Sequence, residues 1–170
     1  MSEALLVAAA ELFAQKGPRG TSVREIAAVA GVNHGLVHQY FGSKDQLLRA
    51  SLERLAHNVT ERLEQEGDRA AGDVALEHEV DLHWRALARA LLDGEDPATL
   101  QREHPVMDRL VTQARRRDLD EPTARRVTAH VVTLELGWRL FHGFITAALD
   151  LDDDDALRGD LLAAAWGVGP

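Results

Sequence analysis

Hydrophobic positions along the chain recur with the spacing of buried helical stripes. Near the N-terminus, Leu5, Ala9, Leu12 and Phe13 repeat at i, i+4, i+7 and i+8, which places their side chains on one face of an α-helix. Similar spacing returns in later segments, and glycine or proline punctuates several of the boundaries between them. We therefore expect an all-α chain with short loops, whose helices span residues 2–16, 22–30, 33–41, 43–65, 73–93, 105–117, 122–149 and 155–166.

The helices predicted over residues 22–30 and 33–41 form a pair joined by a tight turn. Ser22 and Glu25 have the spacing of a capping box, which marks the start of the first helix. Gly31 lies in the turn and, because it has no Cβ, can adopt the positive φ that a tight turn demands. Two short helices joined by a glycine-containing turn are the outline of a DNA-binding helix–turn–helix.

The second helix of this pair has an apolar side and a polar side. Val32, Val37 and Phe41 are spaced to anchor it from beneath. The outward positions carry hydrogen-bonding side chains with few charges, which suits them to reading the edges of bases. These positions are Asn33, His34, Gly35, His38 and Gln39. On the residues alone, a plain helical hairpin with a solvated polar face stays open as an alternative.

A longer stretch around this pair resembles the N-terminal domain of the tetracycline-repressor (TetR) family of transcriptional regulators. The resemblance covers about residues 5–55, where LFAQKG, TSVREIA, AGV and YFGSKDQLL follow one another at the family spacing. Family members often carry threonine and tyrosine where this chain has Leu36 and His38. Because those positions touch or flank bases, the operator sequence is not inferred from a relative.

The resemblance implies a fold and a function. It predicts a three-helix DNA-binding domain over residues 1–45 and a helical bundle for ligand binding and dimerisation over residues 46–170. The protein would be a transcriptional regulator, a repressor that acts as a homodimer on a palindromic site in double-stranded DNA. The alternatives are a regulator that activates or responds to a protein partner, and a helical enzyme or metal-binding bundle that keeps the helix–turn–helix only as a fold element.

The resemblance also assigns contacts with DNA. Helix N-termini present free N–H groups and a partial positive charge, which suits the start of the helix at residue 22 to binding phosphate. The expected phosphate contacts are Thr21, Ser22, Arg24, Tyr40 and Lys44. The expected major-groove residues are Asn33, His34, Gly35, His38 and Gln39. At Gly35, a larger side chain would collide with DNA.

The helix predicted over residues 122–149 is apolar on two faces, so both faces must be covered. A chain of 170 residues has limited means to do this by itself, which favours a partner subunit over a single monomeric core. The expected dimer interface comprises Val132, Leu136, Leu140, Gly143 and Ala147, with Leu161, Leu162, Ala165 and Trp166 from the last helix.

The resemblance further implies a small-molecule pocket among the C-terminal helices. Candidates by position and residue type are Trp84, Leu87, Met107, Leu110, Trp138, Phe141, His142 and Phe144. Ordinary core packing is the alternative for each apolar member, and His83, His130 and His142 are expected to be structural. The aromatic and aliphatic character of the set favours an apolar or amphipathic effector.

Composition excludes several other chemistries. The chain has no cysteine, which rules out disulfides, cysteine-ligated zinc, iron–sulfur clusters and thiol catalysis. It contains no catalytic signature, and Glu79 and His83, one helical turn apart, lack a third convergent metal ligand, so we expect no cofactor and no metal. No apolar stretch reaches 18 residues and no basic segment precedes the first apolar residues, so we expect a cytoplasmic protein with neither a transmembrane helix nor a signal peptide.

Charge is distributed unevenly along the chain. The net charge is −9, yet residues 1–55 carry +1 and the remainder carries −10. A near-neutral segment can face a polyanion if its basic groups lie on one side, whereas the acidic remainder would be repelled. This asymmetry is consistent with an N-terminal DNA-binding part.

Overall fold

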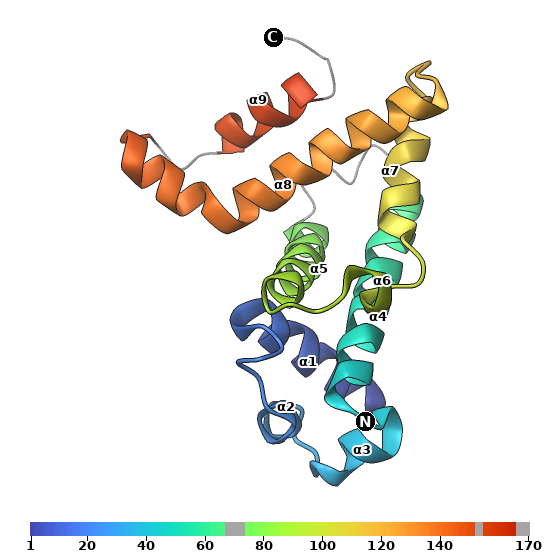
Figure 1. Ribbon diagram of the computed structural model, residues 1–170, viewed down its shortest axis with the longest axis vertical. Coiled ribbons are helices and arrows are strands. Elements are labelled where there is room, and N and C mark those ends of the chain that lie inside the picture. The colour runs from blue at the N-terminus through green and yellow to red at the C-terminus, as the bar shows by residue number, and fades with distance from the viewer. Residues whose placement is uncertain (67–73, 152–154, 166–170) are drawn as a thin grey trace. The chain divides into compact units, whose positions relative to one another are not determined.

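The computed structural model describes residues 1–66, 74–151 and 155–165, and within these ranges the chain forms helices and no strand (Figure 1). The expected all-α fold is confirmed. No helix in the described ranges is long and apolar enough to cross a membrane. In chain order the helices are α1 (Ser2–Lys16), α2 (Val23–Val29), α3 (Gly35–Phe41), α4 (Lys44–Glu66), α5 (Val74–Leu92), α6 (Pro97–Leu100), α7 (Pro105–Arg115), α8 (Glu121–Leu149) and α9 (Asp155–Ala165).

The chain packs as two compact units, residues 1–106 and 107–170. The first contains α1 to α6, and the second contains most of α7 together with α8 and α9. The boundary expected at residues 45/46 falls in the first turn of α4, inside the first unit. The division by packing, at residues 106/107, thus lies further along the chain than the expected boundary. The boundary at 45/46 separates two expected functions and stays a prediction.

The core of the first unit is built around α1, which packs against α2, α4 and α5. The predicted stripe Leu5, Ala9, Leu12 and Phe13 is buried, as expected. The recognition pair contributes Ile26, Ala27 and Val37, while α4 contributes Leu47, Leu48 and Leu52. The small residues Ala86 and Ala90 of α5 belong to the same core, so α5 helps to hold the helix–turn–helix in place.

Capping side chains set the helix starts where the sequence predicted them. The Ser22 hydroxyl accepts a hydrogen bond from the Glu25 N–H at 3.2 Å, and the Ser43 hydroxyl accepts one from the Gln46 N–H at 3.1 Å. Gly31 has a φ of +67°, the conformation expected for the turn. The short helix α6 was not predicted; Asp96 caps it by accepting a hydrogen bond from the Ala98 N–H.

Two polar contacts connect the end of α5 to the last turn of α1 and to the loop that follows it. The Arg89 Nε donates to the Ala14 carbonyl at 2.9 Å, and an Asp93 carboxylate oxygen accepts from the Arg19 N–H at 2.8 Å. Gly17 makes room for this approach, since a Cβ there would lie 2.6 Å from the Asp93 oxygen. The C-terminal end of α5 therefore fixes the entry to the recognition pair.

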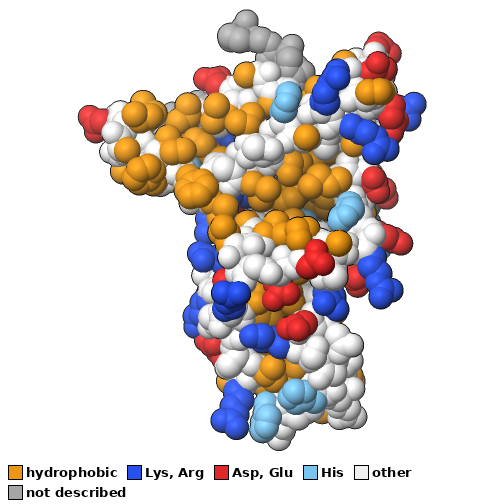
Figure 2. Space-filling view, in the orientation of Figure 1, with side chains coloured by type: hydrophobic (Ala, Val, Ile, Leu, Met, Phe, Trp, Pro, Cys, Tyr) orange, Lys and Arg blue, Asp and Glu red, His pale blue; other side chains and the backbone are white. Residues whose placement is uncertain are grey.

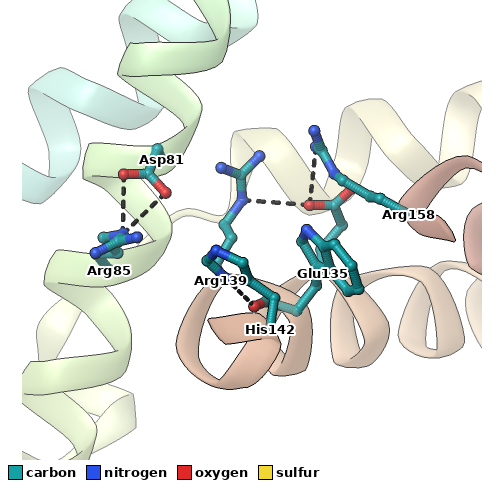
Figure 3. A network of polar contacts seen from close by, with 7 residues as sticks. Asp81, Arg85, Glu135, Arg139, His142 and Arg158 are labelled. Carbon is teal, nitrogen blue, oxygen red and sulfur yellow. Dashed lines mark hydrogen bonds and ion pairs between the residues drawn. The ribbon is translucent and has the colours of Figure 1, made fainter. Parts of the chain in front are cut away.

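In the second unit, α8 and α9 pack together around a nearly buried carboxylate (Figure 3). The Glu135 side chain accepts from the Arg158 guanidinium of α9 at 3.0 and 3.1 Å. Arg139, one turn further along α8, places its Nε 3.2 Å from the Oε2 of the same carboxylate. One acidic group thus holds two guanidinium groups and joins the two helices.

Candidate nucleic-acid interface

The helix α3 is seated by a few apolar contacts and leaves a polar face exposed. Val37 is fully buried, while Val32 and Phe41 are half-buried beneath the helix. The five outward positions predicted from the sequence are all exposed, namely Asn33, His34, Gly35, His38 and Gln39. In the view of Figure 2, histidine side chains lie next to a lysine or arginine side chain at the end that carries α2 and α3. This face is the candidate surface for DNA.

The start of α3 is closed by Asn33. Its side-chain oxygen accepts a hydrogen bond from the Gly35 N–H at 2.8 Å, although the N-cap position of the helix is His34 and not Asn33 as expected. The helix itself begins at Gly35, two residues later than predicted, because residues 33 and 34 form a tighter turn with bonds to Leu36 and Val37. A Cβ at Gly35 would lie 3.2 Å from the Asn33 oxygen, so this glycine also has a local reason to lack a side chain.

The end of α3 is closed by His38 and Gly42. The Gly42 N–H donates to the His38 carbonyl at 3.0 Å, and the His38 Nδ1 lies 3.0 Å from the Gly42 carbonyl oxygen. Gly42 has a φ of +74°, which allows the chain to reverse directly into α4. Both ends of the recognition helix are therefore fixed by side chains that also belong to its outward face.

The residues expected to contact phosphate separate into two kinds. Ser22 and Arg24 are exposed at the start of α2, and Arg24 has no hydrogen-bond or ion-pair partner among the described residues. Thr21, in contrast, is only 2% exposed and its hydroxyl donates to the carbonyls of Gly17 and Leu12. A buried hydroxyl bonded to the backbone does not reach a phosphate, so the expected side-chain contact by Thr21 is corrected to a structural role.

Lys44 and Tyr40 complete the expected phosphate set. Tyr40 is exposed on α3. Lys44 begins α4 and its ammonium group donates to the carbonyls of Pro18 and Thr21, at 2.7 and 3.2 Å. An ammonium group has three N–H donors, so one is left for a phosphate. Lys44 therefore braces the loop before α2, a role that the sequence did not reveal.

Local charges around α2 are partly compensated. The Lys16 ammonium is hydrogen-bonded to the Glu25 carboxylate, and this contact holds the pKa of Glu25 below its ordinary value. Glu25 therefore stays ionised beside the first turn of α2, where a negative charge is favoured by the helix dipole. Arg24 is the neighbouring cation that this pairing leaves available.

The expected dimer residues occupy different environments. Val132 is buried within the chain, and Leu136, Leu140 and Ala165 are half-buried, whereas Gly143, Ala147 and Leu161 are exposed. The Leu162 side chain and Trp166 lie outside the described residues. The assignment of these residues to a dimer interface stays a prediction.

The expected pocket residues divide between the two units. In the first, Trp84 is buried with its ring 5.0 Å from that of His83, and Leu87 packs against the core. In the second, Met107 and Leu110 are half-buried, and Trp138 stacks on His142 with ring centroids 5.5 Å apart.

Phe141 and Phe144 of α8, also expected in the pocket, are 54% and 75% exposed. Both side chains are open to solvent in the single chain, and their place in a ligand pocket stays a prediction. Figure 2 shows hydrophobic side chains gathered over the C-terminal part of α8. Its large exposed members are Phe141, Phe144, Ile145 and Leu149, which we call the α8 apolar patch.

A hollow of about 370 Å³ in the first unit was not predicted. Its volume lies within the range of small-molecule sites, but charged and polar side chains line it. The lining residues are Glu53, Ala56, His57, Gln101, Arg102, Glu103 and Pro105. Within the described ranges, no three histidine, aspartate or glutamate side chains come together as a metal site.

The buried underside of α2 and α3, the Gly31 turn and the exposed polar face of α3 define a helix–turn–helix DNA-binding protein. Residues 5–51 match the family described as bacterial regulatory proteins, tetR family. An HTH-type transcriptional repressor of Mycobacterium tuberculosis is 43% identical over 95% of this chain and 82% of its own length. An HTH-type transcriptional regulator of Mycobacterium bovis matches to the same extent.

Solved structures agree with this assignment. A protein from Rhodococcus sp. assigned to the TetR family superposes with a TM-score of 0.64 at 28% identity, over 99% of this chain and 98% of its own. The chain therefore belongs to the TetR family of transcriptional regulators. The plain helical hairpin and the helical enzyme or metal-binding bundle are not favoured by these relationships.

Proposed function

We propose that this regulator is a homodimeric repressor that binds a palindromic operator through α3 of each subunit and releases it when a small molecule binds. The observation that carries the proposal is the α3 face, on which five exposed positions are held by a buried apolar underside and by caps at both ends. A helix of this kind fits the major groove, where base edges present distinct patterns of donors and acceptors.

The phosphate contacts are proposed to flank this face. Arg24 and Ser22 at the start of α2 lie beside free N–H groups, while Tyr40 and the remaining N–H of Lys44 lie at the end of α3. Because Lys44 also braces the loop before α2, its phosphate contact would position both ends of the helix–turn–helix at once. These contacts supply affinity and register, whereas the α3 face supplies sequence preference.

The α8 apolar patch supports a dimer. Phe141, Phe144, Ile145 and Leu149 follow the i, i+3, i+4 and i+8 spacing of one helical face, and all four are exposed in the single chain. A contiguous exposed apolar face marks an interaction site in a soluble protein. Two copies related by a two-fold axis would present two α3 helices to half-sites about one helical turn of DNA or a multiple apart.

Release requires a ligand that binds the conformation unable to bind DNA more tightly than the binding one. We place the effector near Trp84, the buried aromatic residue of α5, and expect it to be apolar or amphipathic. The helix α4 starts directly after α3, and the end of α5 is bonded to the last turn of α1 and to the loop before α2. Both helices can carry a shift to the recognition pair, with a coupling of about 5- to 150-fold in affinity.

The decisive experiment is selection of bound sequences from a random DNA pool, followed by a gel shift with the selected site and with DNA that flanks the regulator's own gene. We expect an inverted repeat and binding that depends on both half-sites. Equal binding to all sequences would contradict the proposal. A specific site without dyad symmetry would contradict the dimer alone.

A further inference from the structure

Asn33 is exposed at the start of α3 with its amide group in a fixed orientation. The Gly35 N–H, 2.8 Å away, is a donor, so the Asn33 atom that receives it is the carbonyl oxygen. The Asn33 NH₂ group is consequently the part of the side chain left for another partner, and no described residue bonds to it. Asn33 thus presents donors to the DNA face.

His38 is exposed five residues further along, and its imidazole is held in a fixed tautomer. A carbonyl oxygen only accepts, so the Nδ1 that lies 3.0 Å from the Gly42 oxygen must carry the proton. In the neutral ring, Nε2 then has a free lone pair and acts as an acceptor. No described residue bonds to it. His34 lies on the same face without a side-chain cap bond and has no such constraint.

We infer that Asn33 and His38 read DNA with fixed and opposite polarity, which makes them specificity-determining residues of the proposed operator complex. Asn33, as a donor, fits base acceptors in the major groove such as the purine N7, guanine O6 or thymine O4. His38, as an acceptor, fits the exocyclic amino group of adenine or cytosine. This inference rests on the proposed function, since it specifies how the same α3 face discriminates bases.

The first test uses the free protein. Nitrogen-15 NMR of the imidazole groups at mildly alkaline pH reports which ring nitrogen carries the proton in each histidine. We expect the Nδ1–H tautomer for His38 and a different, unconstrained distribution for His34. Observation of the Nε2–H tautomer at His38 would overturn the inference, whatever DNA the protein binds.

The second test deletes single functional groups from the selected operator. Replacing adenine by purine, or cytosine by 2-pyrimidinone, removes one exocyclic amino group, and 7-deaza purines remove one N7. At the base pair that faces His38, loss of the amino group should weaken binding by about 5-fold, the size of one hydrogen bond. The variant His38→Ala has no side-chain acceptor at this position, so it should be insensitive to that deletion.

Asn33→Asp is the matched change at the other end of the helix. The variant keeps the oxygen that accepts from the Gly35 N–H and replaces the outward NH₂ donor by an acceptor oxygen. Deleting the base acceptor that faces residue 33 should therefore weaken DNA binding by the wild type but not by this variant. His34→Asn serves as the control, because it should leave the amino-group sensitivity assigned to His38 intact.

Coupling of His38 to a base acceptor, or of Asn33 to an amino group, would overturn the inference while leaving the proposed function standing. If the selection returns no specific sequence, the proposed function fails and the inference fails with it. The NMR and DNA results therefore distinguish the two failures.

Discussion

At the scale of single residues, several side chains at the DNA end have a bond to the backbone in addition to the role that the motif implies. The Thr21 hydroxyl is bonded to carbonyls within the α1–α2 segment, and Lys44 reaches back from α4 to the same loop. Such contacts hold the surface in a binding geometry before DNA arrives, which lowers the ordering cost of association. Arg24, in contrast, is exposed and available for phosphate.

Arg24 should therefore act as a simple phosphate contact. Arg24→Gln removes one neutralised phosphate, so affinity should fall to a similar extent on all DNA sequences, and the slope of log K against log salt should fall by about 1. Binding measured over a salt series tests this. Arg116→Gln, an equal charge change at an exposed position just after α7, is the control and should leave the slope unchanged.

His83 should make stability depend on pH. It is 2% exposed, nothing described hydrogen-bonds to its Nδ1, and burial lowers its pKa from 6.5 to about 4. At a pH between these two pKa values, His83 is protonated in the unfolded chain but neutral in the folded chain. The free energy of unfolding therefore falls as the pH falls from 6.5 towards 4. The total loss is roughly 3 kcal/mol, and there is no contribution above pH 6.5.

Urea unfolding at several pH values measures this dependence. His83→Leu removes the titrating group and its unsatisfied nitrogen, so its stability curve should be flatter than that of the wild type over the same interval. If the two curves are parallel, His83 is not the group responsible.

At the scale of elements, the pairing of α8 with α9 depends on a polar contact between side chains of the two helices. Glu135 is largely buried between Arg139 of its own helix and Arg158 of α9. A carboxylate removed from water is tolerated when nearby cations compensate its charge, as the two guanidinium groups do here. The contact thus fixes where α9 lies on α8.

Glu135→Gln should therefore be destabilising, by about 3 kcal/mol, because the carboxylate that Arg139 and Arg158 both contact is replaced by a neutral amide in a poorly solvated site. The measurement is the midpoint and slope of denaturant unfolding. Glu121→Gln, on the same helix, is the control: its pairs with Arg115 and Arg125 are exposed, so we expect a loss of about 0–1 kcal/mol. Equal losses for the two variants would mean that Glu135 is effectively solvated.

At the scale of the whole molecule, the DNA-binding segment and the exposed apolar patch lie in parts of the chain that differ in net charge. The near-neutral segment over residues 1–55 contains the helix–turn–helix, while the rest of the chain has a net charge of −10. The α8 apolar patch belongs to this acidic remainder. A surface that carries both exposed phenylalanines and neighbouring leucine and isoleucine side chains is suited to association with a second copy rather than with DNA.

Phe144→Glu and Leu149→Glu should each disrupt the proposed dimer, because each places a charge in an interface that removes apolar surface from water. Light scattering should then report a monomer, and binding to a full palindrome should approach the binding to one half-site. Leu92→Glu is the control, since Leu92 is 75% exposed on α5 and lies outside the α8 apolar patch. Dimers in both α8 variants would place the interface elsewhere.

The sequence by itself determined most helix boundaries, the turn at Gly31 and the outward face of α3. These features depend on residues within a few positions of one another: capping bonds such as Ser22 to Glu25, glycine at positive φ, and the helical period. The family motif falls in the same segment, which is why the class of protein could be predicted. The short helix α6 was missed because four residues are too few to show a period.

Only the tertiary structure decided what each side chain faces. The burial of Thr21, the reach of Lys44 to residue 18, the place of Glu135 between two arginines and the exposure of Phe141 and Phe144 all depend on how separate segments pack. On a helix that is apolar on two faces, the same residue type can line a pocket, a core or a subunit interface. The periodicity predicts that such faces exist, but packing against distant segments determines which of them remains exposed.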